Sequence, residues 1–174
     1  MIKIIRINNE NKESLQLPNE DFHIFGKLIP TFKDETWSYQ EEIFEKSWSM
    51  KFPDENYSLE NIDNRGFALA AFDGEKCIGF AIFEDTWNKF MYLMDLKVNK
   101  EYRKQGIASL LLTSAVGEIK NRGYKGINTI GQDNNLAACR FYLNNGFKIG
   151  GIDNMNYKFT QQEGKTDIYF YLEF

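Results

Sequence analysis

The stretch VNKEYRKQGIASLLL, residues 98–112, constrains this chain most, because a helix is expected to begin in it without the usual polar cap. An apolar run ends at Val98, Arg103 and Lys104 follow, and Gly106 precedes an amphipathic segment. A helix N-terminus presents unpaired N–H groups and a partial positive charge of roughly +0.5, so Ser, Thr, Asp or Glu is usual there. Here cations are added instead. The pattern indicates a bound anion, a phosphate group approached closely by backbone that only Gly permits.

The hydrophobic periodicity along the chain predicts an α/β fold with strands and helices in one mixed sheet. Turn signals such as Asp73-Gly74 separate apolar runs that we interpret as strands, and apolar residues spaced three and four apart predict helices. Predicted strands are 2–7, 66–72, 76–86, 90–98, 126–131, 147–159 and 166–174; predicted helical segments are 22–29, 38–48, 105–122 and 133–147. We expect a single domain over 1–174 whose central sheet of about six to seven strands carries helices on both faces.

Composition excludes several classes of function. The net charge is -4, and the 21 Lys and Arg residues are scattered, so no footprint for nucleic acid is expected. MIKIIRINNENKES has no apolar signal core and no segment is long enough to span a bilayer, so we expect a cytoplasmic protein without membrane contacts. Cys77 and Cys139 are interpreted as buried thiols, with a disulfide as the alternative, and His23 lacks partners for a metal site.

The phosphate signal matches neither of two common nucleotide motifs. Gly106 is followed by Ile107 where a Walker-type loop needs Lys, and no GxGxxG is present. The element Arg103-x-x-Gly106-x-Ala108 is weak evidence alone, because a helix that merely begins with basic residues and uses Gly for close packing would have the same sequence. A second element, NLAACRFYLNNGF (135–147), follows one strand and one helix later. Together the two resemble the Gcn5-related N-acetyltransferase (GNAT) superfamily, and most closely its streptothricin acetyltransferases.

The resemblance covers about residues 66–174 and implies an acyltransferase that uses acetyl-CoA as cosubstrate, without a metal. In such enzymes a substrate amine attacks the acetyl thioester directly. The resemblance assigns the pantetheine arm to the backbone of one strand and the pyrophosphate to the following loop. The expected cofactor-binding residues are Leu96, Lys97, Val98, Arg103, Lys104, Gln105, Gly106, Ile107, Ala108, Ser109, Asn135 and Tyr142.

Two proton transfers are needed, and the resemblance supplies only one clear candidate. Tyr142 matches the general acid that protonates the leaving thiolate, although it could instead be a core residue, and Asn134 and Asn135 could be helix caps. The positions where many relatives carry a basic carboxylate hold Met94 and Ile130. Asp95 remains as the candidate base, but strand alternation points it opposite to Met94 and Leu96.

The acceptor site is the least defined part of the prediction. Glu84 and Asp85 are alternative acids, each equally well explained as solvated surface, and aromatic residues could stack on a cationic substrate or simply pack. The expected substrate-binding residues are Trp37, Glu84, Trp87 and Tyr92. The implied acceptor is the primary amine of a small molecule such as a streptothricin-like antibiotic. A protein or peptide N-acetyltransferase and a non-catalytic acyl-CoA-binding module are the alternatives, and a homodimer through the C-terminal strand is also considered.

Overall fold

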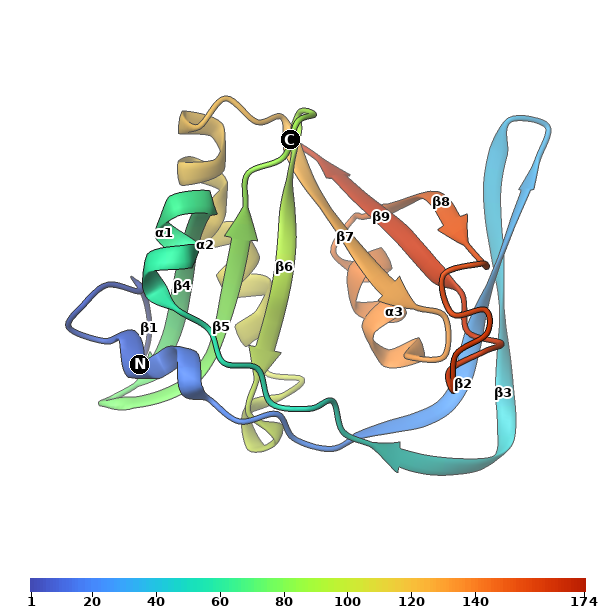
Figure 1. Ribbon diagram of the computed structural model, residues 1–174, viewed down its shortest axis with the longest axis horizontal. Helices are drawn as coiled ribbons and strands as arrows, with labels where there is room; N and C mark the ends of the chain where they lie inside the picture. The colour runs from blue at the N-terminus through green and yellow to red at the C-terminus, as the bar shows by residue number, and fades with distance from the viewer. The chain divides into compact units, whose positions relative to one another are not determined.

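The computed structural model describes all residues, 1–174. Residues Met1–Asp21 and Lys51–Ile127 make one compact unit, and residues Phe22–Met50 and Asn128–Phe174 make a second. Seven strands are assigned to one mixed sheet, of which β1-β4-β5-β6 lie in the first unit and β7-β9-β8 mainly in the second (Figure 1). The predicted α/β fold class is therefore confirmed, whereas the expectation of a single domain over 1–174 stays a prediction.

The first unit is an antiparallel sheet built from the apolar runs that the sequence predicted. Its strands are β1 (Ile2–Arg6), β4 (Gly66–Asp73), β5 (Lys76–Glu84) and β6 (Phe90–Val98). β4 and β5 join through Gly74, whose φ of +61° is in the left-handed region that favours Gly. Most residues of β4 and β5 are buried, because helices cover both faces of these two strands.

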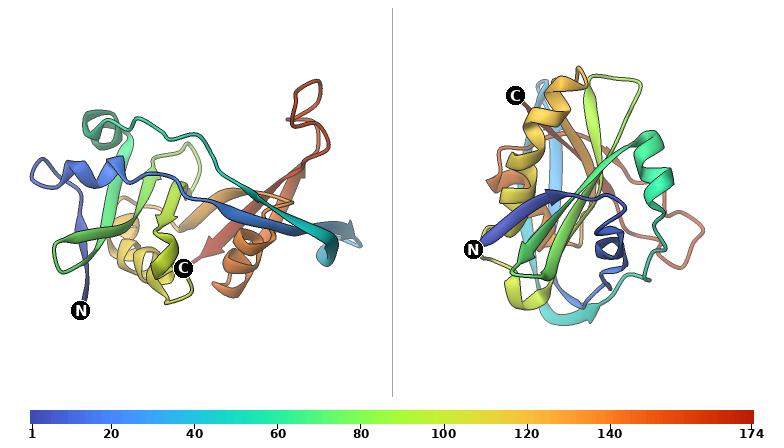
Figure 2. Two further views of the ribbon diagram at one scale, coloured as in Figure 1. Left: turned by 90° about the horizontal axis from the view of Figure 1, so that it is seen from below. Right: turned by 90° about the vertical axis from the view of Figure 1, so that its left-hand side faces the viewer.

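Two helices lie on opposite sides of this part of the sheet (Figure 2, right). α2 (Ile107–Asn121) packs against all four strands and buries the stripe Leu111, Ala115 and Ile119. α1 (Leu59–Arg65) packs against β4 and β5, and the short 3-10 helix η1 (Lys12–Gln16) contacts β5. The core on the α1 side consists of Ile7, Leu15, Ile62, Ala68, Ala70, Phe80 and Ile82.

The second unit contains a long hairpin where the sequence predicted helices. β2 (Phe22–Lys33) and β3 (Thr36–Met50) pair antiparallel from Phe22↔Met50 to Lys33↔Thr36. The helical interpretation of 22–29 and 38–48 is wrong, because alternate β2 residues such as Ile24 and Leu28 are buried and packing overrides helix propensity. Asp34 and Glu35 make the two-residue turn with φ of +50° and +59°, which Asn-Gly usually provides.

The rest of the second unit follows the predicted order, with one shortened strand. It contains β7 (Gly126–Gln132), α3 (Leu136–Asn144), β8 (Lys148–Asp153) and β9 (Asp167–Glu173). α3 packs against β2, and β8 pairs antiparallel with β9. The strand predicted over 147–159 ends at Asp153, where the carboxylate accepts from the backbone N–H groups of Met155 and Asn156 and turns the chain.

Helix α1 occupies a stretch for which the sequence predicts no element. Ser58 caps it, since its hydroxyl oxygen accepts from the backbone N–H of Asn61 at 3.5 Å. Ile62 is its one buried residue, so a seven-residue helix offers almost no periodic signal. A short 3-10 helix, η2 (Lys100–Tyr102), follows β6. None of the helices is long and apolar enough to cross a bilayer.

Two adjacent leucines in α2 test how much the core of the first unit contributes to the free energy of unfolding. Leu111 is 0% exposed and Leu110 is 40% exposed. We expect Leu111→Ala to lower the free energy of unfolding by about 2–5 kcal/mol, because it leaves a cavity in a packed core. Leu110→Ala removes the same atoms from the surface and serves as the matched control. Urea denaturation measures both; similar losses in the two variants would contradict the assigned packing face.

Candidate active site

The loop before α2 in the first unit has the backbone geometry that its sequence predicted. Gly106 occupies the position before α2 with φ of +81°, and no side chain caps the helix. Lys104 also has positive φ, +61°, and residues 104–106 are exposed. A Cβ at Gly106 would contact nothing within 4 Å, so the protein itself does not require a glycine for space. The requirement is conformational, and it leaves the helix N-terminus open to an anion.

Arg103 holds this loop in place through contacts within the protein. Its Nε donates to the backbone oxygen of Val98 at 3.1 Å, and a second guanidinium nitrogen donates to the backbone oxygen of Asp21 at 2.9 Å. The Glu20 carboxylate lies 3.9 Å from the guanidinium and accepts from the backbone N–H of Lys100 at 2.6 Å. These contacts join the loop to the end of β6 and to residues 20–21, and they fix the orientation of the uncapped end of α2.

A β-bulge in β6 changes which residues face α1. β5 and β6 pair as Phe83↔Leu93 and then Ile82↔Asp95, so Met94 is the extra residue. Met94 packs against the core on the α1 side, and Asp95 reaches a residue packed on that same core. The expectation that Asp95 points opposite to Met94 is wrong, because it assumed an unbroken alternation along the strand.

Asp95 is a partly buried carboxylate with one side-chain partner. The Tyr57 hydroxyl donates to Asp95 Oδ2 at 2.9 Å. Burial raises the pKa of Asp95 above its usual value, and this effect is offset in part by the Lys97 ammonium and the Tyr57 hydrogen bond. Such a carboxylate binds a proton more readily than one at the surface, which suits a group that must accept one.

Lys97, two residues after Asp95 on β6, is the cation whose charge lowers the pKa of this carboxyl. Its side chain is 10% exposed, donates to the backbone oxygen of Leu17 and to Glu55 Oε2 at 3.0 Å each, and lies 5.0 Å above the Phe80 ring. Burial raises the pKa of Glu55, but hydrogen bonds from Asn19 and Lys97 outweigh it, so the pKa is lowered. Tyr57, which the sequence analysis did not single out, belongs to the same face.

The second sequence element forms α3 and its two ends in the second unit. Asn135 caps the helix, since its Oδ1 accepts from the backbone N–H of Ala138 at 3.2 Å. Gly146, with φ of +87°, ends it, and Phe147 then turns back into the core at 3% exposure. Several motif residues therefore have structural roles, and the Asn135 amide nitrogen is the part left for a ligand.

Tyr142 lies on α3 among aromatic rings. Its ring centroid is 5.4 Å from that of Phe147 and 5.2 Å from that of Phe170. Gly131 in β7 lies beside these rings, because a Cβ there would be 3.1 Å from Phe170 and 3.7 Å from Tyr142. The ring is therefore fixed by packing, so its hydroxyl has a defined position.

The residues predicted to bind substrate have different surroundings. Glu84 pairs in register with Tyr92 across β5 and β6, and its carboxylate lies 3.8 Å from the Arg65 guanidinium. Trp87 is 96% exposed in the following loop. Trp37, in the second unit, stands opposite Phe32 near the hairpin turn, with ring centroids 4.9 Å apart. These assignments stay predictions, as does the backbone of β6 as a cofactor site.

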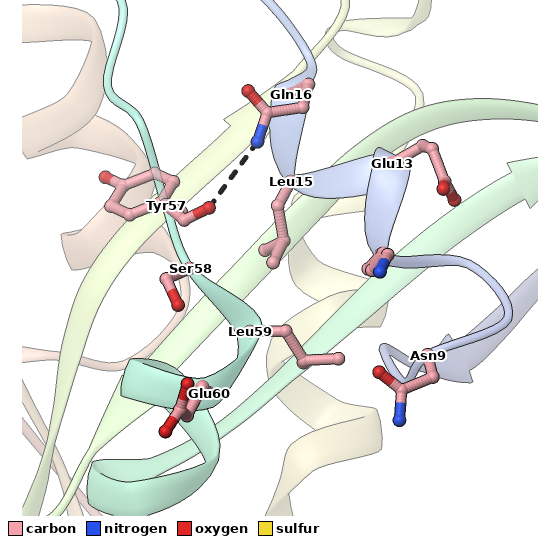
Figure 3. A pocket seen from close by; sticks show the side chains of 9 residues that line it. Asn9, Glu13, Leu15, Gln16, Tyr57, Ser58, Leu59 and Glu60 are labelled. Carbon is pink, nitrogen blue, oxygen red and sulfur yellow. Dashed lines mark hydrogen bonds between the residues drawn. The ribbon is translucent and has the colours of Figure 1, made fainter.

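The first unit also has a pocket that the sequence did not indicate. It measures about 460 Å³ and lies between η1 and the start of α1 (Figure 3). Leu15 and Leu59 form its apolar floor among polar side chains, and the Gln16 amide donates to the Tyr57 backbone oxygen at 3.4 Å. The pocket therefore borders the segment that carries Tyr57.

Comparison with known proteins decides the family. The model of the Acetyltransferase (GNAT) family matches residues 33–147. The chain belongs to this family. It is therefore an acyltransferase, as the two sequence elements implied.

One curated relative and one solved structure cover nearly the whole chain, and a second curated relative covers two thirds of it. Streptothricin acetyltransferase A of Bacillus subtilis (strain 168) is 31% identical over 172 residues, 98% of this chain and 99% of the relative. Streptothricin acetyltransferase of Escherichia coli is 30% identical over 115 residues, 66% of each chain. A candidate streptothricin acetyltransferase of Bacillus anthracis, solved in complex with acetyl coenzyme A, has a TM-score of 0.90, 26% identity and 100% coverage of both chains. The likeness thus extends over the hairpin and α1, beyond the two motifs.

Gly106 and Gly117 distinguish two reasons for a glycine: a backbone conformation that other residues avoid, and a lack of space for a side chain. At both Gly106 and Gly117 an added Cβ would meet open space, but only Gly106 has positive φ. We expect Gly106→Val to lower the free energy of unfolding by about 1–2 kcal/mol, because an L-residue is strained in the left-handed region. Gly117→Ala, inside α2, should raise it by about 0.5–1 kcal/mol. Thermal unfolding without ligand measures both; a neutral Gly106→Val would contradict the left-handed cap.

Proposed function

We propose that this protein transfers the acetyl group of acetyl-CoA to a primary amine of a small molecule, with a streptothricin-like antibiotic as the acceptor. The observation that carries the proposal is the uncapped α2 N-terminus behind left-handed Gly106, in a chain similar to a streptothricin acetyltransferase over 98% of its length. Acetyl-CoA would supply a thioester that is activated toward an amine.

The phosphates of this cosubstrate fit the loop 103–109. Its backbone N–H groups and the partial positive charge of α2 bind anions, and exposed Lys104 adds a cation. Arg103 contributes mainly by holding the loop, since its guanidinium is engaged by Val98 and Asp21. The Asn135 amide nitrogen is proposed to donate to the pantetheine arm, while its oxygen caps α3.

Two side chains are proposed to carry the protons. Asp95 accepts the proton that the amine loses as its nitrogen bonds to the acetyl carbon, and burial, which raises the pKa of this carboxyl, favours that role. Tyr142 donates a proton to the sulfur as the carbon–sulfur bond breaks, so that CoA leaves as the thiol. Met94 and Ile130 stand where many relatives carry a carboxylate, and the proposal needs neither of them.

The acceptor is tested by measuring release of the CoA thiol with streptothricin, a panel of small amines and a peptide with a free N-terminus. We expect turnover with streptothricin. The Gly106→Glu variant should lose it and should lose the stabilisation of roughly 2.7 kcal/mol that acetyl-CoA gives at a hundred times its dissociation constant. Gly117→Glu adds the same charge inside α2 and should retain both. Preference for the peptide would support a protein acetyltransferase, and binding without thiol release a non-catalytic module.

Replacing Tyr142 by Phe separates the proton donor from a packing residue. The ring is kept, so contacts with Phe147 and Phe170 should persist and acetyl-CoA should bind as before. Turnover should fall by about 10²- to 10⁴-fold, as for a lost general acid. Tyr169→Phe, on β9, is the matched control and should keep its rate. Normal turnover of Tyr142→Phe would assign the proton to solvent.

A further inference from the structure

The segment between β3 and α1, residues 51–58, carries a tyrosine whose hydroxyl is directed at Asp95. Tyr57 donates to Asp95 Oδ2 at 2.9 Å, and its ring stands edge-on to Phe80 with centroids 6.1 Å apart. The ring packs against the core on the α1 side, and Ser58, the next residue, caps α1. The Tyr57 ring is thus held by packing, and its backbone is held by the start of α1, which follows at once.

The backbone before Tyr57 is fixed by a polar cluster. The Asn19 amide donates to the Glu55 carboxylate at 3.0 Å and to the Pro53 oxygen at 2.8 Å, and its backbone N–H donates to Asp54 at 2.6 Å. Lys97 on β6 completes the cluster with its 3.0 Å ion pair to Glu55. Because Lys97 and Asp95 belong to one strand, the segment is anchored to the strand that carries the carboxylate.

The charges around Tyr57 fix the direction of the hydrogen bond. Burial first, and then the nearby Asp95 carboxylate, raise the pKa of Tyr57 far above its usual value. Glu55 and Glu84 act in the same direction, and their charges are countered by Lys97 and Arg65. Tyr57 therefore stays protonated and acts as a donor, so it can orient a carboxylate but cannot itself accept a proton.

We propose that Tyr57 is a positioning residue that holds Oδ2 of Asp95, leaving the other carboxylate oxygen to accept the proton of the substrate amine. The inference rests on the proposed function, in which Asp95 is the proton acceptor. The bulge at Met94 brings Asp95 to the α1 face, where Tyr57 meets it.

The test compares Tyr57→Phe with Tyr102→Phe, Asp95→Asn and wild type. Tyr102 also donates to a carboxylate, Asp73 at 3.2 Å, and so is a matched control outside the site. The Tyr57 hydrogen bond lowers the pKa of Asp95, so its loss should raise that pKa. The base is active only when deprotonated, and the acidic limb of the kcat/KM profile should therefore move to higher pH in Tyr57→Phe. At the acidic side kcat should fall by roughly tenfold, as for a lost hydrogen bond to a charged group, with KM for acetyl-CoA unchanged.

A carbon-13 NMR titration of the Asp95 carboxyl gives a readout that does not depend on turnover. Its midpoint should rise in Tyr57→Phe and stay unchanged in Tyr102→Phe. With 3-fluorotyrosine at position 57, whose hydroxyl is a stronger donor, it should fall back to the wild-type value or below. An unchanged midpoint in Tyr57→Phe would overturn the inference. If the midpoint rises but Asp95→Asn turns over normally, Asp95 is not the base and the positioning role falls, although the acetyltransferase function stands. If wild type shows no turnover with any amine, the proposed function fails, and the inference about the reaction fails with it.

Discussion

The extra residue in β6 is the constraint on which the rest of the first unit depends. A regular strand would send Leu93 and Asp95 to the same face, and then either an apolar side chain would leave the core or a carboxylate would enter it. With one residue inserted, Met91 and Leu93 remain buried while the partly buried Asp95 and Lys97 lie on the α1 face, where Tyr57 bonds to Asp95. The bulge thus lets one strand complete a hydrophobic core over its first half and support polar chemistry over its second.

The sequence predicted best what depends on local chemistry. Long apolar runs flanked by turns identified β4, β5 and β6. The pattern around Gly106 identified the uncapped start of α2 and its left-handed residue, because backbone conformation acts within a few residues. Cys139, predicted as a buried thiol, is fully buried, and burial raises its pKa to about 12. Cys77, also predicted as a buried thiol, is only partly buried, and both cysteines are free.

What the sequence did not predict depends on partners distant along the chain. The hairpin Phe22–Met50 contains helix-favouring residues such as those of QEEIFEK, and only pairing across Asp34 and Glu35 makes it extended. Tyr57 meets Asp95 across 38 positions of sequence, so no local pattern could signal the contact. The bulge could not be predicted either, because it is defined by the pairing register with β5 and not by the sequence of β6 alone.

The two ends of the hairpin β2–β3 are held together by strand pairing and hydrogen bonds, which affects how the chain folds. Residues 22–50 interrupt the first unit, yet Phe22 pairs with Met50, and Asn19 is bonded to Pro53, Asp54 and Glu55 on either side of the interruption. Once the hairpin has formed, residues 21 and 51 lie close together. The entropic cost of closing this 29-residue loop is then offset by pairing within the hairpin, and not by contacts of the first unit. The interruption is therefore a self-closing insertion. Its tip, residues 31–36, is exposed and can change without disturbing the strands that follow, whereas the part of β2 that packs against α3 is held by that contact.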